Sequence, residues 1–572
     1  MALLPICRCW RLFIFGLAAC LLCIDISGRL SFHLFGVPFV TLYILCVLVT
    51  LLPYQMRTPI QFLLCLVIFV TSLTDIYCQE YFGSRITSQI VNMMMQTDDR
   101  EISDFLTTYI NSSIFMRWRI IVLFLLFVIT LLSFFYHSHL DREKSCPSIY
   151  HLLAGLCVLF LLLIEIPSQV RFFKLLSSSE TIQEIEGMTF QDYDKGAATP
   201  MHRLALSLSV TFHTGSLLQE IRHTTLGAEI DSCSYESPHI VLVIGETYNK
   251  HHSQLYGYPL ETTPHQVQRN ATGELFVFND VVTPWNITSN VFTSAFSLWH
   301  YGNIESIGNY PLFPILFRRA GYHVRFFSNQ YIQDGLRRVG TNLSGGFFLG
   351  DKVLSDSLFN YRNENPSTFD MGLVGQFIEY VDSVGDVPYT LDILHLIGQH
   401  FNYKSRYPRS AEYFHTTDYE NRHLTHAQSE LIATYDNATR YNDLVIDSIL
   451  THYEHEEAIV IYVADHGEEV FDDLPVRGRL FQEPSIRQAR QEFEVPLWIW
   501  CSPIYRASHK KIMKEIKMSV NQPFMTDDLS QLLLYLAGIR SQWTRYYNSP
   551  ISKEYNSSRP RLLYGKVDYD KL

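Results

Sequence analysis

At 572 residues the chain exceeds one ordinary domain, and 47% of its residues are apolar. The mean hydropathy of +0.04 is high for a soluble protein. The formal net charge is −12, and no dense patch of Lys and Arg is interleaved with aromatic residues, which argues against a nucleic-acid partner.

Five apolar segments lie within the first 170 residues. Each holds roughly 18–21 mostly apolar residues, enough to cross a ~30 Å hydrocarbon core as a helix. They fall near 10–27, 32–52, 60–78, 118–136 and 149–167. Because a cleavable signal peptide would not be followed by four more spans, we predict a five-helix transmembrane domain over 1–170 with an outer loop near 79–116.

An odd number of spans places the two chain ends on opposite sides of the membrane. Arginines occur on both sides of the predicted spans, so the positive-inside rule decides little. The connection over 79–116 is polar and acidic, as expected of an outer loop. We therefore expect the N-terminus inside and the large C-terminal domain outside.

Residues 171–230 are mixed in character and are expected to form juxtamembrane linker helices. Their stretch LALSLSVTFHTGSLLQEI suits either a helix on the membrane surface or a plain connector helix. From 231 to 572, short β-branched or aromatic runs alternate with longer helical stretches, which predicts an α/β domain with a mostly parallel sheet flanked by helices. The runs are HIVLVI, ELFVF, YHVRFF, TLDILHLI, AIVIYVA and VPLWIW.

Only two of the 11 cysteines, Cys233 and Cys501, belong to this domain. In an oxidising compartment one bridge between them is feasible. The sequence leaves open whether these two thiols are paired or free.

Two of the predicted strands run into side chains that bind metal ions. HIVLVI leads into Gly245-Glu246-Thr247, and AIVIYVA leads into Asp465-His466. Because the strands of an open α/β sheet gather reactive groups at their carboxyl ends, these two ends are expected to meet. Carboxylate oxygen and imidazole nitrogen together suit zinc. Either end alone also fits a cap or a solvated turn, but two in one domain favour a metal site.

A hydroxyl group lies between them in the segment FNDVVTPWNITSNVFTSAFSLW. Thr288 and Ser289 fall at a predicted helix N-terminus, where backbone N–H groups and the helix dipole favour an anionic phosphate. Metal coordination would lower the pKa of the Thr288 hydroxyl and make it a nucleophile. The alternative is that Thr288 is only the N-cap of the helix.

Several blocks, in order and spacing, resemble those of membrane-bound phosphoethanolamine transferases of the alkaline phosphatase/sulfatase superfamily. The blocks are VLVIGETYNKHHSQLYGYPLETTP, FNDVVTPWNITS, HLIGQHFNYKSRYP, YDNATRYND, YVADHGEEVFD and the terminal KVDYDKL. The resemblance covers essentially the whole chain and is greatest to the branch that modifies lipopolysaccharide core sugars. It implies a sulfatase-like fold for 231–572, in a multi-pass protein of the bacterial inner membrane with its catalytic domain in the periplasm.

The resemblance also implies a chemistry. Its zinc ligands would be Glu246, Thr288, Asp465 and His466, with Thr288 as the nucleophile. The donor would be phosphatidylethanolamine, which would form a phosphoethanolamine-threonine intermediate and release diacylglycerol. The acceptor would be a cell-envelope glycan or lipopolysaccharide, at a core sugar or at lipid A, and the sequence does not decide between them.

Three more residues are candidates at the edge of this site. His400, in the GQH block, would contact the phosphoryl group, act as acid or base, or bind a second metal ion; the alternative is a surface turn residue. Asn329 and Gln330 follow another predicted strand and are expected either to touch the substrate or to shape a loop.

The chain departs from the family in one respect. Many members carry another histidine shortly after the Asp-His pair, and FDDLPVRGRLFQEPSIRQARQEFEVP contains none. One of its arginines would supply positive charge there, since a guanidinium binds phosphate oxygens bidentately; the alternative is that these arginines are solvated surface residues. The candidates are Arg477, Arg479, Arg487 and Arg490, and the sequence singles out none of them. One zinc site is therefore expected, and a second stays open.

Rival functions fit the same residues to different degrees. A formylglycine sulfatase needs Cys-X-Pro-X-Arg, and Cys501-Ser-Pro-Ile-Tyr505 lacks the Arg, which disfavours sulfate-ester hydrolysis. A phosphoglycerol transferase of the same superfamily, a phosphodiesterase-type hydrolase and an inactive membrane scaffold remain as alternatives.

Overall fold

The computed structural model describes residues 3–24, 33–82, 85–86, 90–91, 117–135, 148–177, 199–330, 348, 351–480 and 484–572. The chain divides into two compact units, one of residues 1–213 with 480–482 and the other of residues 214–479 with 483–572. The boundary between them falls inside helix α11 (Pro200–Leu226), which contains the predicted connector stretch. The expected domain boundaries at 170 and 230 stay a prediction.

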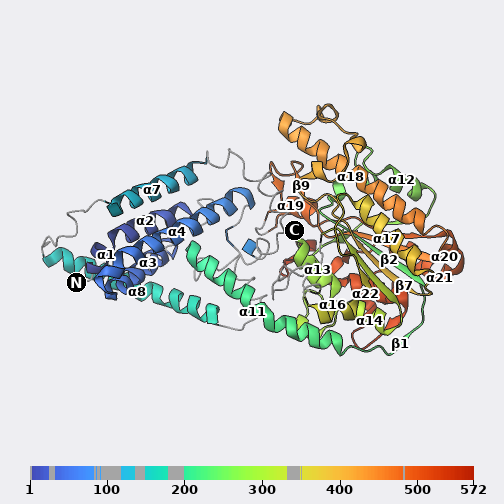
Figure 1. The fold of residues 1–572 in the computed structure, drawn as a ribbon, viewed down its shortest axis with the longest axis horizontal. Coiled ribbons are helices and arrows are strands. Elements are labelled where there is room, and N and C mark those ends of the chain that lie inside the picture. Colours follow the sequence, from blue (N-terminus) through green and yellow to red (C-terminus); the bar gives the residue numbers. More distant parts are fainter. Residues whose placement is uncertain are drawn as a thin grey trace. The chain divides into compact units, whose positions relative to one another are not determined.

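The first unit is helical in its described residues (Figure 1). Its helices are α1 (Leu4–Arg8), α2 (Trp10–Leu22), α3 (His33–Leu51), α4 (Tyr54–Phe82), α7 (Trp118–Phe135), α8 (Ser148–Ser177) and the start of α11. Four stretches within these helices are long and apolar enough to cross a membrane: Leu34–Leu51, Tyr54–Glu80, Trp118–Phe135 and Gly155–Lys174. They correspond to the last four predicted spans.

The first predicted span is shorter than expected. Helix α2 has 13 residues. At the rise of an α-helix it covers only ~20 Å, less than the ~30 Å of a hydrocarbon core. It still belongs to the bundle, because it packs against α3, α4 and α7. The expected outer loop near 79–116 lies mostly outside the described residues.

A buried ion pair fixes the start of α11 within this unit. Arg203 donates through Nε to Oδ1 of Asp75 in α4 at 2.9 Å, and both side chains are almost fully buried. Because an unpaired charge is costly among apolar helices, this pair holds the two helices in one register.

A seven-stranded sheet forms the centre of the second unit, in the order β3-β11-β8-β2-β7-β5-β6. The strands are β3 (Leu275–Phe278), β11 (Leu497–Cys501), β8 (Ala458–Ala464), β2 (His239–Gly245), β7 (Thr390–His395), β5 (His323–Ser328) and β6 (Tyr361–Arg362). β11 runs antiparallel to both of its neighbours, and the other neighbouring pairs are parallel. All six predicted strands are confirmed, whereas the two-residue β6 was missed.

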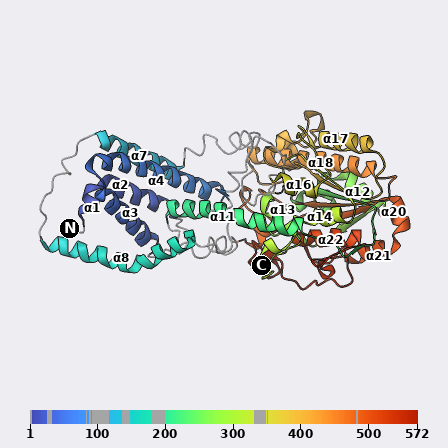
Figure 2. The ribbon, with the colours of Figure 1, turned by 60° about the horizontal axis from the view of Figure 1, so that its bottom comes forward.

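Helices cover both faces of this sheet. Figures 1 and 2 show α17 (Asp370–Val384) and α18 (His426–His452) on one face and α14 (Phe313–Arg319) and α22 (Leu529–Ala537) on the other. The other α-helices among the described residues of this unit are α12 (Pro264–Ala271), α13 (Thr288–Phe296), α16 (Lys352–Leu358), α19 (Ile486–Glu492), α20 (Pro503–Ser508) and α21 (Lys510–Ser519). With both faces covered, β2 and β8 are apolar along almost their whole length, as is typical of buried parallel strands.

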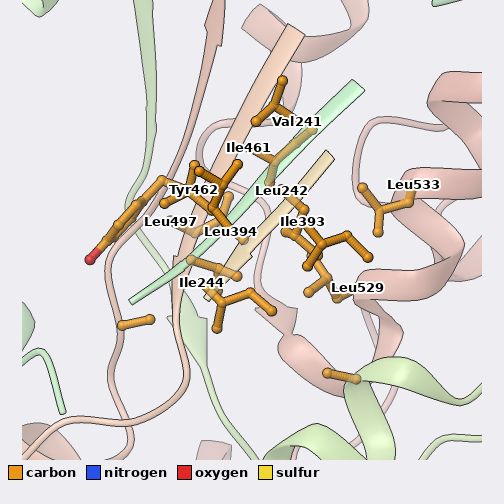
Figure 3. Close-up of a cluster of buried hydrophobic side chains, with 14 of the residues drawn as sticks. Val241, Leu242, Ile244, Ile393, Leu394, Ile461, Tyr462, Leu497, Leu529 and Leu533 are labelled. Atoms are coloured by element: carbon orange, nitrogen blue, oxygen red, sulfur yellow. The ribbon is translucent and has the colours of Figure 1, made fainter. Parts of the chain in front are cut away.

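The core lies where these strands meet the helices. Figure 3 shows side chains of β2, β7, β8 and β11 beside Leu529 and Leu533 of α22, and all of these leucines, isoleucines and valines are buried. This packing holds the ends of the central strands in fixed positions.

Where the structure describes the second unit, it also contains four two-stranded sheets. They pair β1 (Ser232–Cys233) with β13 (Ile539–Arg540), β9 (Glu469–Val470) with β10 (Arg477–Gly478), β4 (Val281–Val282) with β12 (Phe524–Met525), and β14 (Leu562–Leu563) with β15 (Val567–Asp568). Cys233 lies in β1 and Cys501 at the end of β11, and both thiols are free.

Candidate metal centre and nucleophile

The two metal-binding strand ends are neighbours in the sheet. β2 and β8 run parallel, and their register pairs Gly245 with Ala464. Glu246 and Asp465 therefore leave the sheet side by side, and the Asp465 N–H donates to the Gly245 carbonyl at 3.0 Å. The prediction that these ends meet at the carboxyl edge of the sheet is confirmed.

Four side chains converge at this edge. Oγ1 of Thr288 lies 3.1 Å from Oε2 of Glu246 and 3.2 Å from Nε2 of His466. The same Nε2 lies 3.3 Å from Oδ2 of Asp465 and 3.5 Å from Oε1 of Glu246. The sequence placed these residues in three separate segments, and the fold brings their donor atoms within contact of one another.

Thr288 reaches this group because it begins helix α13. The N-cap of the helix is Ile287, and Thr288 is the first helical residue. The alternative in which Thr288 is only an N-cap is therefore wrong: its hydroxyl faces Glu246 and His466. The N–H groups of a first helical turn have no partner inside the helix, so an anion bound at Thr288 would meet them.

Backbone and side-chain hydrogen bonds orient the carboxylates. Thr247 has a positive φ of 55°, a costly conformation for a β-branched residue. Its N–H donates to Oδ1 of Asp465 at 3.0 Å, and its hydroxyl donates to Glu246. The His466 N–H also donates to Oδ1 of Asp465, at 2.7 Å. The turn after β2 therefore directs the other oxygen of Asp465 toward the site.

Hydrogen bonding also fixes the histidine tautomer. Nδ1 of His466 donates to the Gly467 carbonyl at 2.8 Å, which leaves the lone pair of Nε2 directed at the site. A Cβ at Gly467 would lie 2.1 Å from the Gln491 carbonyl oxygen, so only glycine fits this turn. Burial and the Arg479 guanidinium lower the pKa of His466 to about 3, and the ring is neutral, as a metal ligand must be.

Gln330 joins the site, whereas Asn329 does not. Nε2 of Gln330 donates to Oε2 of Glu246 at 2.8 Å and to the Leu396 carbonyl at 3.2 Å. Asn329 is buried and bonds instead to Asp370 at 2.9 Å and to the Ser367 N–H at 2.7 Å. These contacts give Gln330 a role in orienting Glu246 and give Asn329 a role in shaping the loop.

His400 follows β7 and is buried, so the surface-turn alternative is wrong. Its Nδ1 has no hydrogen bond to any part of the chain that the structure describes. Burial lowers the pKa of His400 to about 3 although the Glu246 carboxylate acts in the opposite direction. A neutral imidazole with an unused nitrogen is thus held near Glu246.

The donor set fits a zinc ion. It offers two carboxylates, one imidazole and one hydroxyl, and tetrahedral ligands at ~2 Å from a metal ion lie ~3.3 Å apart, close to the separations given above. Oδ2 of Asp465 is buried and accepts no hydrogen bond from the described residues. Burial and the Glu246 carboxylate raise the pKa of Asp465 well above its ordinary value. A bound cation would satisfy this oxygen and let both carboxylates ionise.

Arg479 also reaches the site. Its Nη1 lies 2.9 Å from Nε2 of His466 and 3.2 Å from the Asn286 carbonyl oxygen. Of the other arginines in this segment, Arg477 lies over the ring of Tyr403, and Arg487 and Arg490 are exposed. The structure thus singles out one of the four candidate arginines.

The comparisons with known proteins agree with this geometry. The sequence matches the sulfatase family over residues 238–539. The chain belongs to the sulfatase family. It is 25% identical over 525 residues to the phosphoethanolamine transferase EptC of Escherichia coli K12, which covers 88% of this chain and 85% of that protein. The predicted resemblance to phosphoethanolamine transferases is confirmed.

Two solved structures share the fold of this sulfatase-family chain. The zinc complex of the C-terminal periplasmic domain of E. coli EptC superposes with a TM-score of 0.52 at 25% identity, over 60% of this chain and 97% of that one. The integral membrane protein lipooligosaccharide phosphoethanolamine transferase A of Neisseria meningitidis gives 0.57 at 18% identity, over 96% and 97%. The predicted fold class, a helical N-terminal domain followed by a sulfatase-like α/β domain, is confirmed.

Proposed function

We propose that this membrane protein transfers phosphoethanolamine from phosphatidylethanolamine to a cell-envelope glycan or lipopolysaccharide, with Thr288 as the nucleophile. One observation carries the proposal: the Thr288 hydroxyl lies within 3.3 Å of both a buried carboxylate and a neutral imidazole at a helix N-terminus. The deprotonated Thr288 oxygen would there face an anionic phosphodiester. The choice of phosphoethanolamine as the transferred group and of a lipooligosaccharide as the acceptor class is taken from the names of the relatives.

The residues divide the work as follows. Glu246, Thr288, Asp465 and His466 would hold zinc, which when bound lowers the pKa of the Thr288 hydroxyl and stabilises charge on the phosphoryl oxygens. Oγ1 of Thr288 loses its proton and forms a bond to phosphorus, and the bond from phosphorus to the diacylglycerol oxygen breaks. Diacylglycerol leaves after its oxygen gains a proton.

An acceptor hydroxyl then attacks the same phosphorus and restores Thr288. The buried ring of His400 is our candidate for contact with the phosphoryl group or for proton transfer. The four membrane-length helices would tether the catalytic unit to the bilayer in which the donor resides. We place the protein in the bacterial inner membrane with the catalytic unit on the periplasmic side.

The intact mass of the full-length protein tests this proposal. After incubation with phosphatidylethanolamine, the wild type should gain one phosphoethanolamine group and Thr288→Ala should gain none. Ser289→Ala is the matched control, because its hydroxyl bonds to Asn290 rather than to the site. An unmodified wild type, or the same adduct on Thr288→Ala, would show the mechanism to be wrong.

Parallel incubations separate the rival functions. An adduct formed only from phosphatidylglycerol would identify a phosphoglycerol transferase. Free phosphoethanolamine without any modified glycan would identify a hydrolase. Purified protein that binds no zinc and gains no adduct would be an inactive scaffold.

A further inference from the structure

Arg479 forms a hydrogen bond to a nitrogen atom of His466 that a metal ion would also bind. Its Nη1 donates to Nε2 of His466 at 2.9 Å. Because Nδ1 of His466 carries the proton that bonds to Gly467, Nε2 has one lone pair for one partner. The guanidinium and a metal ion are therefore alternative partners of the same nitrogen atom.

A second contact keeps the guanidinium beside the nucleophile after that exchange. The same Nη1 lies 3.2 Å from the carbonyl oxygen of Asn286, two residues before Thr288. Oγ1 of Thr288 in turn lies 3.2 Å from Nε2 of His466. With Nε2 occupied by a metal ion, the contact with Asn286 would keep the N–H groups of Arg479 near enough to Thr288 to reach oxygens on a phosphorus atom bonded to it.

Charge makes this arrangement selective for an anion. A guanidinium never loses its proton, so it adds a permanent positive charge beside the metal site. That charge repels a second divalent ion and attracts phosphoryl oxygens, to which guanidinium binds in a bidentate, charge-assisted way. An arginine at this point would thus supply the positive charge that a second metal ion would otherwise supply, and would hold the phosphoryl oxygens by hydrogen bonds alone.

We infer that Arg479 is a substrate-binding residue that rests on His466 in the metal-free protein and binds the phosphoryl oxygens at Thr288 once a single metal ion is bound. The inference rests on the proposed function and names its phosphate-binding group. Arg479 would form only hydrogen bonds to the substrate, so Thr288 remains the residue that is modified.

The test uses full-length protein in detergent, loaded with zinc, and inorganic phosphate as the probe. Calorimetry gives the affinity for phosphate, and elemental mass spectrometry gives zinc per chain. We expect one zinc per chain in the wild type. Arg479→Gln should keep its zinc but bind phosphate at least tenfold more weakly, and Arg479→Lys should fall between. Arg487→Gln is the matched control, since Arg487 is exposed in the same segment, and should bind phosphate like the wild type.

Competition for His466 gives a second readout that needs no catalysis. Without its guanidinium partner, Nε2 is more available, so Arg479→Gln should bind zinc as tightly as the wild type or more tightly. Loss of zinc from Arg479→Gln would make Arg479 a structural residue and overturn the inference. Two zinc ions per wild-type chain, or phosphate affinity in Arg479→Gln equal to that of Arg487→Gln, would also overturn it.

The proposed function and this inference fail differently. A wild type that gains no phosphoethanolamine adduct, yet binds phosphate through Arg479, would refute the transferase and leave the assignment of Arg479 intact. An adduct on Thr288 with no effect of Arg479→Gln on phosphate binding would do the reverse.

Discussion

Two groups of buried charges lie on the same sheet, and they differ in how the charges are balanced. In the interior, Arg325 of β5 faces Asp392 of β7 and donates through Nη2 to Oδ2 at 2.7 Å. Tyr453 and Thr390 donate to the same oxygen at 2.6 and 3.1 Å. Each charge has an opposite charge and its lone pairs are used, so this pair serves the fold.

At the carboxyl edge, the balance is incomplete. Glu246 and Asp465 bring two carboxylates together with a neutral imidazole, and one oxygen of Asp465 accepts no hydrogen bond from the described residues. Burial without a partner is unfavourable for folding, so such a group is kept for what it binds. Burial of charged groups alone therefore does not identify the site; the site is where buried charges lack a partner of opposite sign.

The largest effect is expected where the unmatched charge is removed. Asp465→Asn keeps an oxygen that accepts from Thr247 and His466 but deletes one negative charge of the metal site. Transfer activity should fall about a thousandfold or more, because a catalytic metal contributes several kcal/mol. Zinc content by elemental mass spectrometry should fall in parallel.

The same substitution should not harm the metal-free fold. Removing one of two adjacent buried carboxylates relieves repulsion, so the thermal unfolding temperature of metal-free Asp465→Asn should equal or exceed that of the metal-free wild type. A clear loss of stability in the metal-free state would place Asp465 among the structural charges and break the comparison.

The matched pair should show the opposite pattern. Asp392→Ala leaves the Arg325 guanidinium buried without its carboxylate and should cost about 3–5 kcal/mol of folding free energy. Thermal unfolding of the full-length protein measures this loss, and zinc per folded chain should stay unchanged. Asp356→Ala is the control, because this carboxylate lies half-exposed in its pairs with Lys352 and Arg362, and surface pairs contribute about 1 kcal/mol or less.

A third cluster balances its charges by binding a proton. His252 is buried between Asp436 and Asp472, with Nε2 at 2.9 Å from the latter, and Arg422 bonds to Asp472 as well. Burial opposes a charged imidazole, but the two carboxylates outweigh it and raise the pKa of His252 to about 10. In the unfolded chain the pKa is ~6.5.

The sign of the pH dependence follows from this difference. Because the folded protein holds the proton more tightly, the stabilisation is complete below pH ~6.5 and is lost as the pH rises through about 10. The wild type should lose a few kcal/mol of stability between pH 7 and pH 10, and His252→Gln, less stable at pH 7, should lose less over that range. Exposed His423→Gln should follow the wild type. Equal slopes for His252→Gln and the wild type would mean that His252 is neutral in the fold.

The sequence sufficed for the features that repeat along the chain. Runs such as HIVLVI and AIVIYVA are almost entirely apolar, because covered parallel strands bury both faces, and the residues that follow two such neighbouring strands lie at one edge. Glu246, Asp465 and His466 could therefore be placed together. Helix α2 shows the limit, since its apolar stretch is longer than the helix itself.

The paths of the loops could not be predicted from the sequence. Asn329 and Gln330 are adjacent, yet the side chain of Asn329 bonds to Asp370, whereas that of Gln330 bonds to Glu246 in the site. The positive φ of Thr247 and the approach of Arg479 to His466 likewise depend on contacts between segments far apart in the chain. The sequence offered four arginines after the Asp-His pair without choosing one, and only the contacts of Arg479 with His466 and Asn286 distinguish it.

The smallest expected effect separates these two neighbouring residues. Gln330→Leu removes the hydrogen bond to Oε2 of Glu246 and should weaken zinc binding about 10- to 100-fold, as loss of a group that orients a metal ligand does. Asn329→Ala removes the bonds to Asp370 and Ser367 and should cost about 1–3 kcal/mol of folding free energy without changing zinc affinity. Competition with a zinc chelator and thermal unfolding measure the two quantities on the same samples. If both variants lost stability alone, Glu246 would be oriented without Gln330, and the division of these neighbours between site and loop would be wrong.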